Sequence, residues 1–154
     1  MSAERVREYL LSHGIAYQTD EHPMAYTTQR VAEVEHISGK KMVKPVIVLV
    51  DGHFVMVVVP GHKRVDMEKV RAAVDSEDVR LATESEFAAV FDDCEAGAEP
   101  PIGGLYGMQT IVDERVRGDR VMFRGGSHTE VISMGVEDYL ALAAHSIADM
   151  AAGV

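Results

Sequence analysis

Two valine-rich runs joined by Asp51-Gly52 constrain the fold of this chain more than any other feature. They read MVKPVIVLV and HFVMVVVP, with only the Asp-Gly pair between them. Asp-Gly between two such runs is typical of a two-residue hairpin turn, in which both central residues adopt positive φ. Both runs are apolar at nearly every position, and strands of that kind are covered on both faces. The sequence therefore predicts an antiparallel hairpin that is packed on both sides.

Helices and strands are predicted on either side of this hairpin. Helical spacing and capping residues predict helices at residues 3–13, 28–36, 67 to about 74, 84–91 and 136 to about 150. Short apolar runs between turn residues predict strands at 17–21, 78–82, 110–112, 120–123 and 130–133. The helices and strands do not alternate strictly. This order indicates an α+β protein with a mixed or mostly antiparallel sheet.

Length and charge limit the classes of function. The 154 residues contain no repeat or linker, so we expect one domain over 1–154. The net charge of −10 opposes a protein that binds DNA or RNA through nonspecific phosphate contacts, although one or two local basic groups could still hold an RNA end. No apolar run approaches the ~20 residues that span a membrane. The charged N-terminus and the single cysteine further favour a cytoplasmic protein.

The stretch CEAGAEPPIGG, residues 94–104, is too rich in glycine and proline for an ordinary turn. Pro100 and Pro101 fix their own backbone, whereas Gly97 and Gly103 permit close approach of a ligand to the main chain. Together they predict a rigid loop with free amides that face one point. Such a loop suits a carbonyl oxygen or an oxyanion. The alternative is a rigid connector that binds nothing.

Two further residues are candidates for a site. Lys44 lies inside the first apolar run, where it either reaches solvent at a strand edge or faces an anion. Pro45 follows it and has no N–H to donate, so this part of the strand should lie at an edge. His128 ends the turn Arg-Gly-Gly-Ser-His, where it lies either in a pocket wall or at the surface.

Metal and cofactor chemistry has no signature in the sequence. The seven histidines and the one cysteine show no metal-ligand spacing, and there is no phosphate-binding loop motif. Cys94 has no companion motif of a nucleophile, and a lone cysteine more often behaves as a small apolar residue. We therefore expect no metal and no cofactor.

Taken in order, these motifs resemble a known family. A helix that ends before HGIAYQTDEHPMAYT, a lysine that opens a hairpin strand, a helix that begins VDMEKV, the Gly-x-x-x-Pro segment GAEPPIG and a late FRGGSHTEVI cover nearly the whole chain. The pattern is similar to that of the YbaK-type aminoacyl-tRNA deacylases, which are relatives of the editing domain inserted in bacterial prolyl-tRNA synthetases. Each motif alone is weak, and their order and spacing are what is specific.

The resemblance implies a fold, a reaction and a set of residues. The fold would be a curved, mixed, mostly antiparallel sheet, partly barrel-like and flanked by helices. The reaction would be hydrolysis of the ester between a wrong, small amino acid and the tRNA 3′ end, without a metal or a protein nucleophile. Lys44 and Gly97 would be catalytic. The remaining matched residues would contact the substrate: Thr27, Ala98, Pro100, Pro101, Gly103 and His128.

Two alternatives to a free-standing deacylase stay open. One is a binding module that holds a tRNA 3′ end or a small ligand without hydrolysing it, and the other is a regulatory protein that binds a synthetase. The deacylase itself would act on aminoacyl-tRNA, with or without a synthetase partner. Pro45 departs from the family pattern, because a residue with a free amide is expected after the lysine. This departure concerns substrate preference more than fold.

Overall fold

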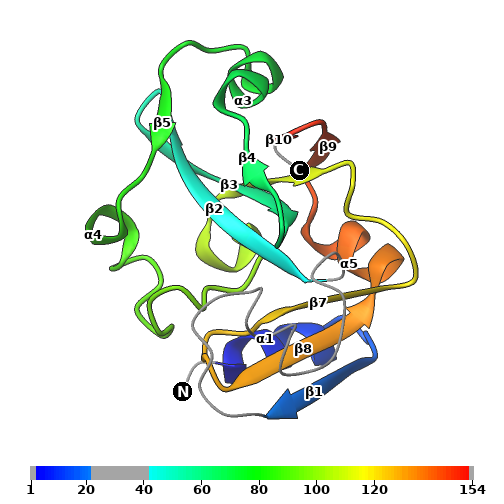
Figure 1. Ribbon diagram of the computed structural model, residues 1–154. Coiled ribbons are helices and arrows are strands. Elements are labelled where there is room, and N and C mark those ends of the chain that lie inside the picture. The colour runs from blue at the N-terminus through cyan, green and yellow to red at the C-terminus, as the bar shows by residue number, and fades with distance from the viewer. Residues whose placement is uncertain (1–2, 22–41, 153–154) are drawn as a thin grey trace.

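The computed structural model describes residues 3–21 and 42–152, and Figure 1 shows their arrangement. The helices are α1 (Ala3–Ser12), α3 (Met67–Val74), α4 (Glu84–Phe87), α5 (Val136–Ala143) and the 3-10 helix η2 (Gly103–Tyr106). The strands are β1 (Tyr17–Glu21), β2 (Val43–Val50), β3 (His53–Pro60), β4 (Arg64–Val65), β5 (Val79–Leu81), β6 (Gln109–Asp113), β7 (Arg120–Arg124), β8 (Glu130–Gly135), β9 (Ser146–Ala148) and β10 (Ala151–Ala152).

The predicted hairpin is the centre of a five-stranded mixed sheet with the order β5-β2-β3-β6-β9. Strands β2 and β3 pair antiparallel along their whole length, from Val43 opposite Pro60 to Val50 opposite His53. Asp51 and Gly52 form the turn with φ of 49° and 83°. These positive values are the ones that a two-residue turn of this type requires. Strand β6 then joins β3 in parallel, and β9 joins β6 in parallel.

The other strands form two smaller antiparallel sheets. One has the order β1-β8-β7 and lies beside α1 in Figure 1, and the other pairs β10 with β4. A single parallel bridge between Met42 and Met122 links the start of β2 to β7. The α+β class with mixed, mostly antiparallel pairing is therefore confirmed. The described strands form three sheets and not a closed barrel.

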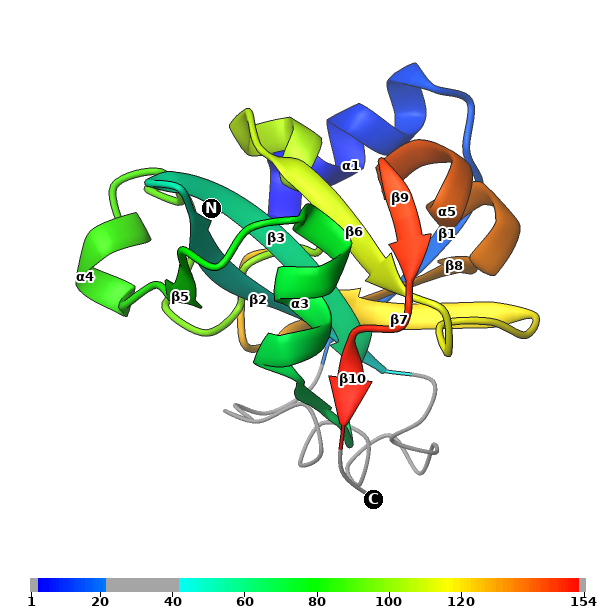
Figure 2. The ribbon, with the colours of Figure 1, turned by 90° about the horizontal axis from the view of Figure 1, so that it is seen from above.

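Both faces of the hairpin are buried, as its composition predicts. One face carries Met56 and Val58 into a core shared with α1, α5 and the β1-β8-β7 sheet. The other face carries Val55, Val57 and Val59 into a second core beneath α3. Figure 2, seen from above, shows α3 on one side of β3 and β6 and α1 on the other. The alternation of side chains along a strand thus places successive valines in two different cores.

Two predicted helices are shorter than expected. The helix at 84–91 ends at Phe87, after which the amides of Val90 and Cys94 bond three residues back, to Phe87 and Phe91. These tighter turns still let Phe87 and Phe91 pack edge to face, with ring centroids 5.8 Å apart. Local turns with bonds to the third residue back thus replace most of the regular helical bonds beyond this point. The predicted helix at 28–36 lies outside the described residues.

The last helix, predicted to run to about residue 150, ends at Ala143 and is followed by β9 and β10. Asp113, which is fully buried, accepts the amides of Met150 and Ala151 at 2.7 Å and 3.0 Å. Arg115 donates to both Asp113 and Asp149, at 3.0 Å and 2.7 Å. A buried carboxylate between two elements therefore captures the C-terminal segment as a strand, which helical periodicity alone does not reveal.

Gly103 sits where the glycine-rich stretch meets the core. Its amide donates to Thr110 Oγ1 at 2.9 Å. A Cβ at Gly103 would lie 2.3 Å from Thr110 Oγ1 and 2.9 Å from the Met108 carbonyl oxygen. Its neighbour Gly104 is exposed, and a Cβ there would have nothing within 4 Å. Only the first of these two glycines is required by packing.

We therefore expect Gly103→Ala to lower the free energy of unfolding by about 1–3 kcal/mol, because the added methyl group must displace Thr110 or the Met108 backbone. The matched control Gly104→Ala should change it by less than about 0.5 kcal/mol, since the methyl group enters open space. Urea denaturation of both variants measures the difference. Equal stabilities would show that η2 is packed more loosely than the structure indicates.

Candidate functional site

The glycine-proline stretch is held against the turn that connects β7 to β8. We call residues 95–101 the Gly97 loop and residues 125–129 the His128 turn. The Glu95 amide donates to the Gly126 carbonyl at 2.8 Å, and the Glu95 carboxylate accepts the His128 amide at 2.7 Å. His128 Nε2 lies 2.6 Å from the Ala96 carbonyl oxygen, which only accepts, so Nε2 carries the proton and donates. The structure thus brings Gly97 and His128 together.

Gly97 itself is exposed at the tip of this loop and has φ of 84°. Its carbonyl accepts a hydrogen bond from Arg124 at 3.2 Å, and its amide donates one to Glu99 Oε2, also at 3.2 Å. A Cβ at this position would lie 3.4 Å from His128 Cε1. Both the backbone angle and the nearby imidazole ring favour glycine here.

The prediction that the loop offers several free amides is wrong. The Gly97 amide is held by Glu99, and the Ala98 amide donates to the Glu95 carbonyl at 3.0 Å. The Gly103 amide is held by Thr110. The sequence shows that the loop is rigid, but the acceptors that satisfy its amides come from side chains and from loop curvature that composition does not specify.

The prolines anchor the loop to the core. Ala98, Pro100 and Pro101 are buried, and the Pro101 carbonyl accepts a hydrogen bond of 2.6 Å from Tyr139. Tyr139 is a fully buried residue of α5. The loop is therefore fixed at two points, at its tip by the His128 turn and at its end by α5.

Glu99 and Arg124 form a buried charged pair around Gly97 that sequence reasoning missed. Glu99 is 8% exposed and Arg124 is 6% exposed. Burial raises the pKa of Glu99, and the nearby Glu84 carboxyl raises it further, while the Gly97 amide opposes the shift. Burial likewise lowers the pKa of Arg124, and the Glu99 charge opposes that shift. Because charged side chains are rarely buried, the burial of Glu99 and Arg124 identifies them as candidate functional residues.

Lys44 is the second residue of β2 and lies opposite Val59. It is half-buried, and burial lowers its pKa. Beyond β3, β2 pairs with β5 only at residues 48–50, so Pro45 lies on an edge of β2 that β5 does not cover, as its missing N–H requires. Among residues 3–21 and 42–152, the Lys44 ammonium has no hydrogen-bond acceptor and no acidic partner, and no hydrogen bond joins it to the Gly97 loop. Thr27 lies outside the described residues.

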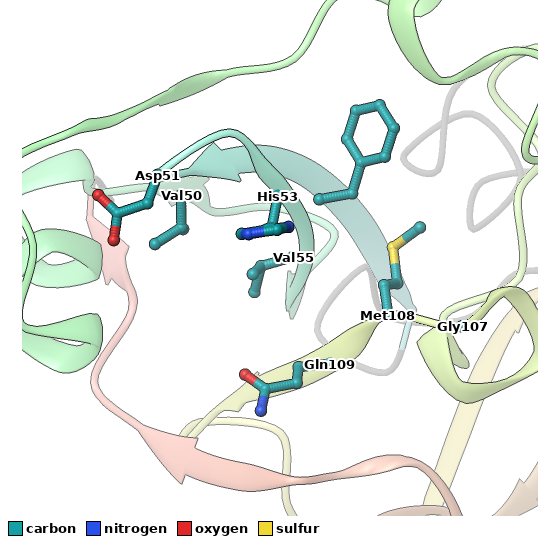
Figure 3. A pocket seen from close by; sticks show the side chains of 8 residues that line it. Val50, Asp51, His53, Val55, Gly107, Met108 and Gln109 are labelled. Atoms are coloured by element: carbon teal, nitrogen blue, oxygen red, sulfur yellow. The ribbon is translucent and has the colours of Figure 1, made fainter.

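A cavity of about 380 Å³ lies at the tip of the hairpin, away from these predicted residues (Figure 3). Its lining comes from the hairpin turn, the start of β3 and the segment before β6: Val50, Asp51, His53, Phe54, Val55, Gly107, Met108 and Gln109. None of Lys44, Gly97 and His128 belongs to this lining. The part of the chain that the structure describes holds no cluster of three or more side chains suited to a metal ion.

Comparison with known proteins identifies the family and the fold. A model of the aminoacyl-tRNA editing domain matches residues 22–142. A scaffold protein from a study of computational epitope grafting shares the fold at a TM-score of 0.86 and 24% identity, over 99% of this chain and 97% of that one. A proposed trans-editing enzyme for prolyl-tRNA synthetase matches at a TM-score of 0.86 and 23% identity, over 98% of this chain and 97% of that one.

A third structure, of a hypothetical protein, matches at a TM-score of 0.85 and 22% identity, over 96% of this chain and 99% of that one. A search of curated proteins found no match. No helix in the described part of the chain has the length and apolar character needed to cross a bilayer. At these identities the structural matches establish the YbaK-like fold, and the domain model establishes the family. The chain belongs to the aminoacyl-tRNA editing domain family.

Proposed function

We propose that this protein is a free-standing deacylase that hydrolyses the ester of a mischarged small amino acid on tRNA. Family membership supports a role on aminoacyl-tRNA. The likeness to a proposed trans-editing enzyme, over nearly the full length of both chains, supports action apart from a synthetase. The observation that carries the proposal is the Gly97 amide, which lies at an exposed glycine in a loop fixed by hydrogen bonds of 2.6–2.8 Å.

In the proposed reaction the Gly97 amide holds the ester carbonyl oxygen. Water adds to the carbonyl carbon and gives up a proton as the C–O bond to the ribose breaks. If the neighbouring ribose hydroxyl adds first, the acyl group moves to that oxygen, and water then hydrolyses the new ester in the same way. The departing ribose oxygen takes a proton, and the amino acid leaves as a carboxylate once water has added. An aminoacyl ester is already activated, so positioning and an amide donor at the developing negative charge supply much of the acceleration.

Lys44 and His128 have different tasks in this scheme. A half-buried lysine without a described acidic partner suits a phosphate of the tRNA 3′ end, because the chain as a whole carries a net charge of −10. His128 donates through Nε2 to the Ala96 carbonyl, so it positions the loop. Pro100 and Pro101 keep the loop rigid, and Ala98 and Thr27 complete the substrate contacts that the family pattern implies.

The proposal requires no metal and no cofactor. The whole chain would act as one editing domain in the cytoplasm, where aminoacyl-tRNA is made. Its acidity favours recruitment by a synthetase that already holds the tRNA, because local basic groups alone give weak affinity for the nucleic acid. The amino acids to test first are alanine, cysteine and serine on a proline-accepting tRNA.

Replacement of Gly97 tests the carbonyl-holding role. Gly97→Ala adds a methyl group 3.4 Å from His128 Cε1 and strains a φ of 84°. Alanine keeps the N–H, but relief of the strained φ turns it away from the ester carbonyl, so we expect kcat/KM for the preferred mischarged tRNA to fall by ~10²-fold, the size of the effect of one oxyanion donor. Gly107→Ala is the matched control, since Gly107 has φ of 73° and open space around it. Its activity should stay within about twofold at a similar cost in stability. Full activity of Gly97→Ala in a folded protein would contradict the proposal.

Replacement of Lys44 tests the phosphate contact. Lys44→Met keeps the length of the side chain and removes its charge. We expect kcat/KM to fall at least ~10-fold, and the slope of log kcat/KM against log salt to become shallower by about 0.7, the value for one phosphate of a single strand. Arg117→Gln removes one charge from an exposed position and should leave the slope unchanged.

The same panel of Ala-, Cys- and Ser-tRNA also decides between an enzyme and a binding module. Absence of turnover on every member, with a synthetase present or absent, would contradict the deacylase and favour the module that binds a tRNA end. In that case Lys44→Met would weaken binding of the tRNA, and neither the wild-type protein nor the variant would hydrolyse it.

Cys94 should take no part in the reaction. Burial raises the pKa of its thiol to about 12, although its contact with Tyr106, at 3.3 Å, opposes the shift. A raised pKa keeps the thiol protonated at neutral pH, so its reactivity should appear only as pH rises toward that value. We expect alkylation at pH 7 on the order of 10³-fold slower than in the unfolded chain. Cys94→Ser should keep full activity, and rapid labelling that abolishes turnover would contradict this assignment.

A further inference from the structure

Glu99 accepts a hydrogen bond from the Gly97 amide, which is the donor that the proposed reaction needs. Its carboxylate accepts the Gly97 amide, although Glu99 is 8% exposed and Gly97 lies at the exposed tip of the loop. An amide that pointed inward with no acceptor would cost free energy comparable to a lost hydrogen bond. Glu99 removes that cost while no substrate is present. A carboxylate oxygen also resembles an ester carbonyl oxygen, and still more an oxyanion, in what it accepts from an amide.

The contact between Glu99 and the Gly97 amide is longer than the bonds that hold the loop to the His128 turn. It measures 3.2 Å, whereas charge-assisted hydrogen bonds are commonly about 2.7–2.9 Å. The bonds that hold Glu95 and Ala96 to the His128 turn are 2.6–2.8 Å long. The bonds that hold the loop to the His128 turn are therefore short, whereas the bond between the Gly97 amide and the Glu99 side chain is long.

The surroundings of Glu99 also oppose a permanent charge there. Glu84, at the start of α4, places a second carboxyl beside it, and burial removes water from it. Arg124, at the end of β7, is the cation that attracts it, and Arg124 also donates to the Gly97 carbonyl. If Glu99 leaves the amide, Arg124 still holds the other side of the Gly97 residue. The loop can thus keep its shape while the carboxylate moves.

We propose that Glu99 is a placeholder, a positioning residue whose carboxylate keeps the Gly97 amide aligned in the free protein and gives way to the substrate carbonyl. This inference rests on the proposed function, since it takes the Gly97 amide as the carbonyl donor. It makes substrate binding a competition between two acceptors for one N–H. Glu99 therefore limits binding of the ester and takes no part in breaking it.

The first test follows displacement directly by NMR, with 3′-alanylamino-3′-deoxyadenosine as the probe, in which an amide replaces the scissile ester. In the wild-type protein the probe should shift both the Gly97 amide resonance and the Glu99 carboxyl carbon, because one acceptor replaces the other. A shift of the Gly97 amide with an unmoved Glu99 carboxyl would overturn the inference. So would an unmoved Gly97 amide under saturating probe.

The second test uses Glu99→Gln, which keeps the size and an acceptor oxygen but removes the charge. A neutral acceptor competes less well, so the probe should bind roughly 3- to 10-fold more tightly, with KM lowered in proportion and kcat within about twofold. Asp92→Asn is the matched control, since it removes one negative charge from an exposed position of the same segment and no bond to Gly97. An equal effect of Asp92→Asn, or a large loss of kcat in Glu99→Gln, would overturn the placeholder.

The two proposals fail in different ways. If the probe displaces Glu99 but no mischarged tRNA is hydrolysed, the deacylase is wrong and the placeholder stands. If mischarged tRNA is hydrolysed while the probe leaves Gly97 and Glu99 unmoved, the placeholder is wrong and another donor serves the reaction. The wild-type titration needs no variant, so the inference stays testable even if Glu99→Gln does not fold.

Discussion

The contact between the Gly97 loop and the His128 turn is the interaction on which the candidate site depends. Glu95 uses both its amide and its carboxylate on the turn, and His128 returns a hydrogen bond to Ala96. The His128 turn connects β7 to β8, and the register of these two strands places Arg124 opposite Val131. Because β7 and β8 pack Phe123 and Ile132 into the main core, the position of an exposed glycine is set by buried apolar contacts two elements away.

His128 and Glu95 hold the Gly97 loop and the His128 turn together through their own hydrogen bonds. His128 is 6% exposed and donates to a carbonyl, which leaves its Nε2 unsuited to accept a proton. Glu95 is engaged at both ends. Their effect on any chemistry is indirect, through the angle at which the Gly97 amide is presented. Among residues 3–21 and 42–152, Glu99 alone accepts that amide, so under the proposed mechanism its carboxylate is the group that a substrate would replace.

Much of the fold followed from local sequence. The Asp51-Gly52 turn and the valine runs specify structure through their own backbone and side chains, and the structure agrees with both. So does the cap of α3, where the Asp66 carboxylate accepts the amides of Glu68 and Lys69. The end of α5 did not follow, because Asp113 accepts the amides of Met150 and Ala151 and so holds the C-terminal segment in an extended form. The end of α4 did not follow either, because the chain beyond Phe87 continues in local turns. Nor could the sequence show that Glu99 and Arg124 are buried around Gly97. Burial of a charge depends on the folded core, and from the sequence alone a glutamate and an arginine are expected at the surface.

The proposed function gives Lys44 and Gly97 different roles, and a complex with a mimic of the tRNA 3′ end can test both. The chain is acidic overall, so under the proposed function a tRNA end would be attracted only locally, by groups such as the half-buried Lys44. The central claim is that the Gly97 amide then receives the ester carbonyl. A crystal structure with a tRNA 3′-end mimic that carries an amide-linked alanine tests it most directly. The account predicts the alanyl carbonyl oxygen at about 3 Å from the Gly97 nitrogen, with Glu99 turned away. A carbonyl bound elsewhere, for example in the cavity at the hairpin tip, with Glu99 still on Gly97, would contradict it.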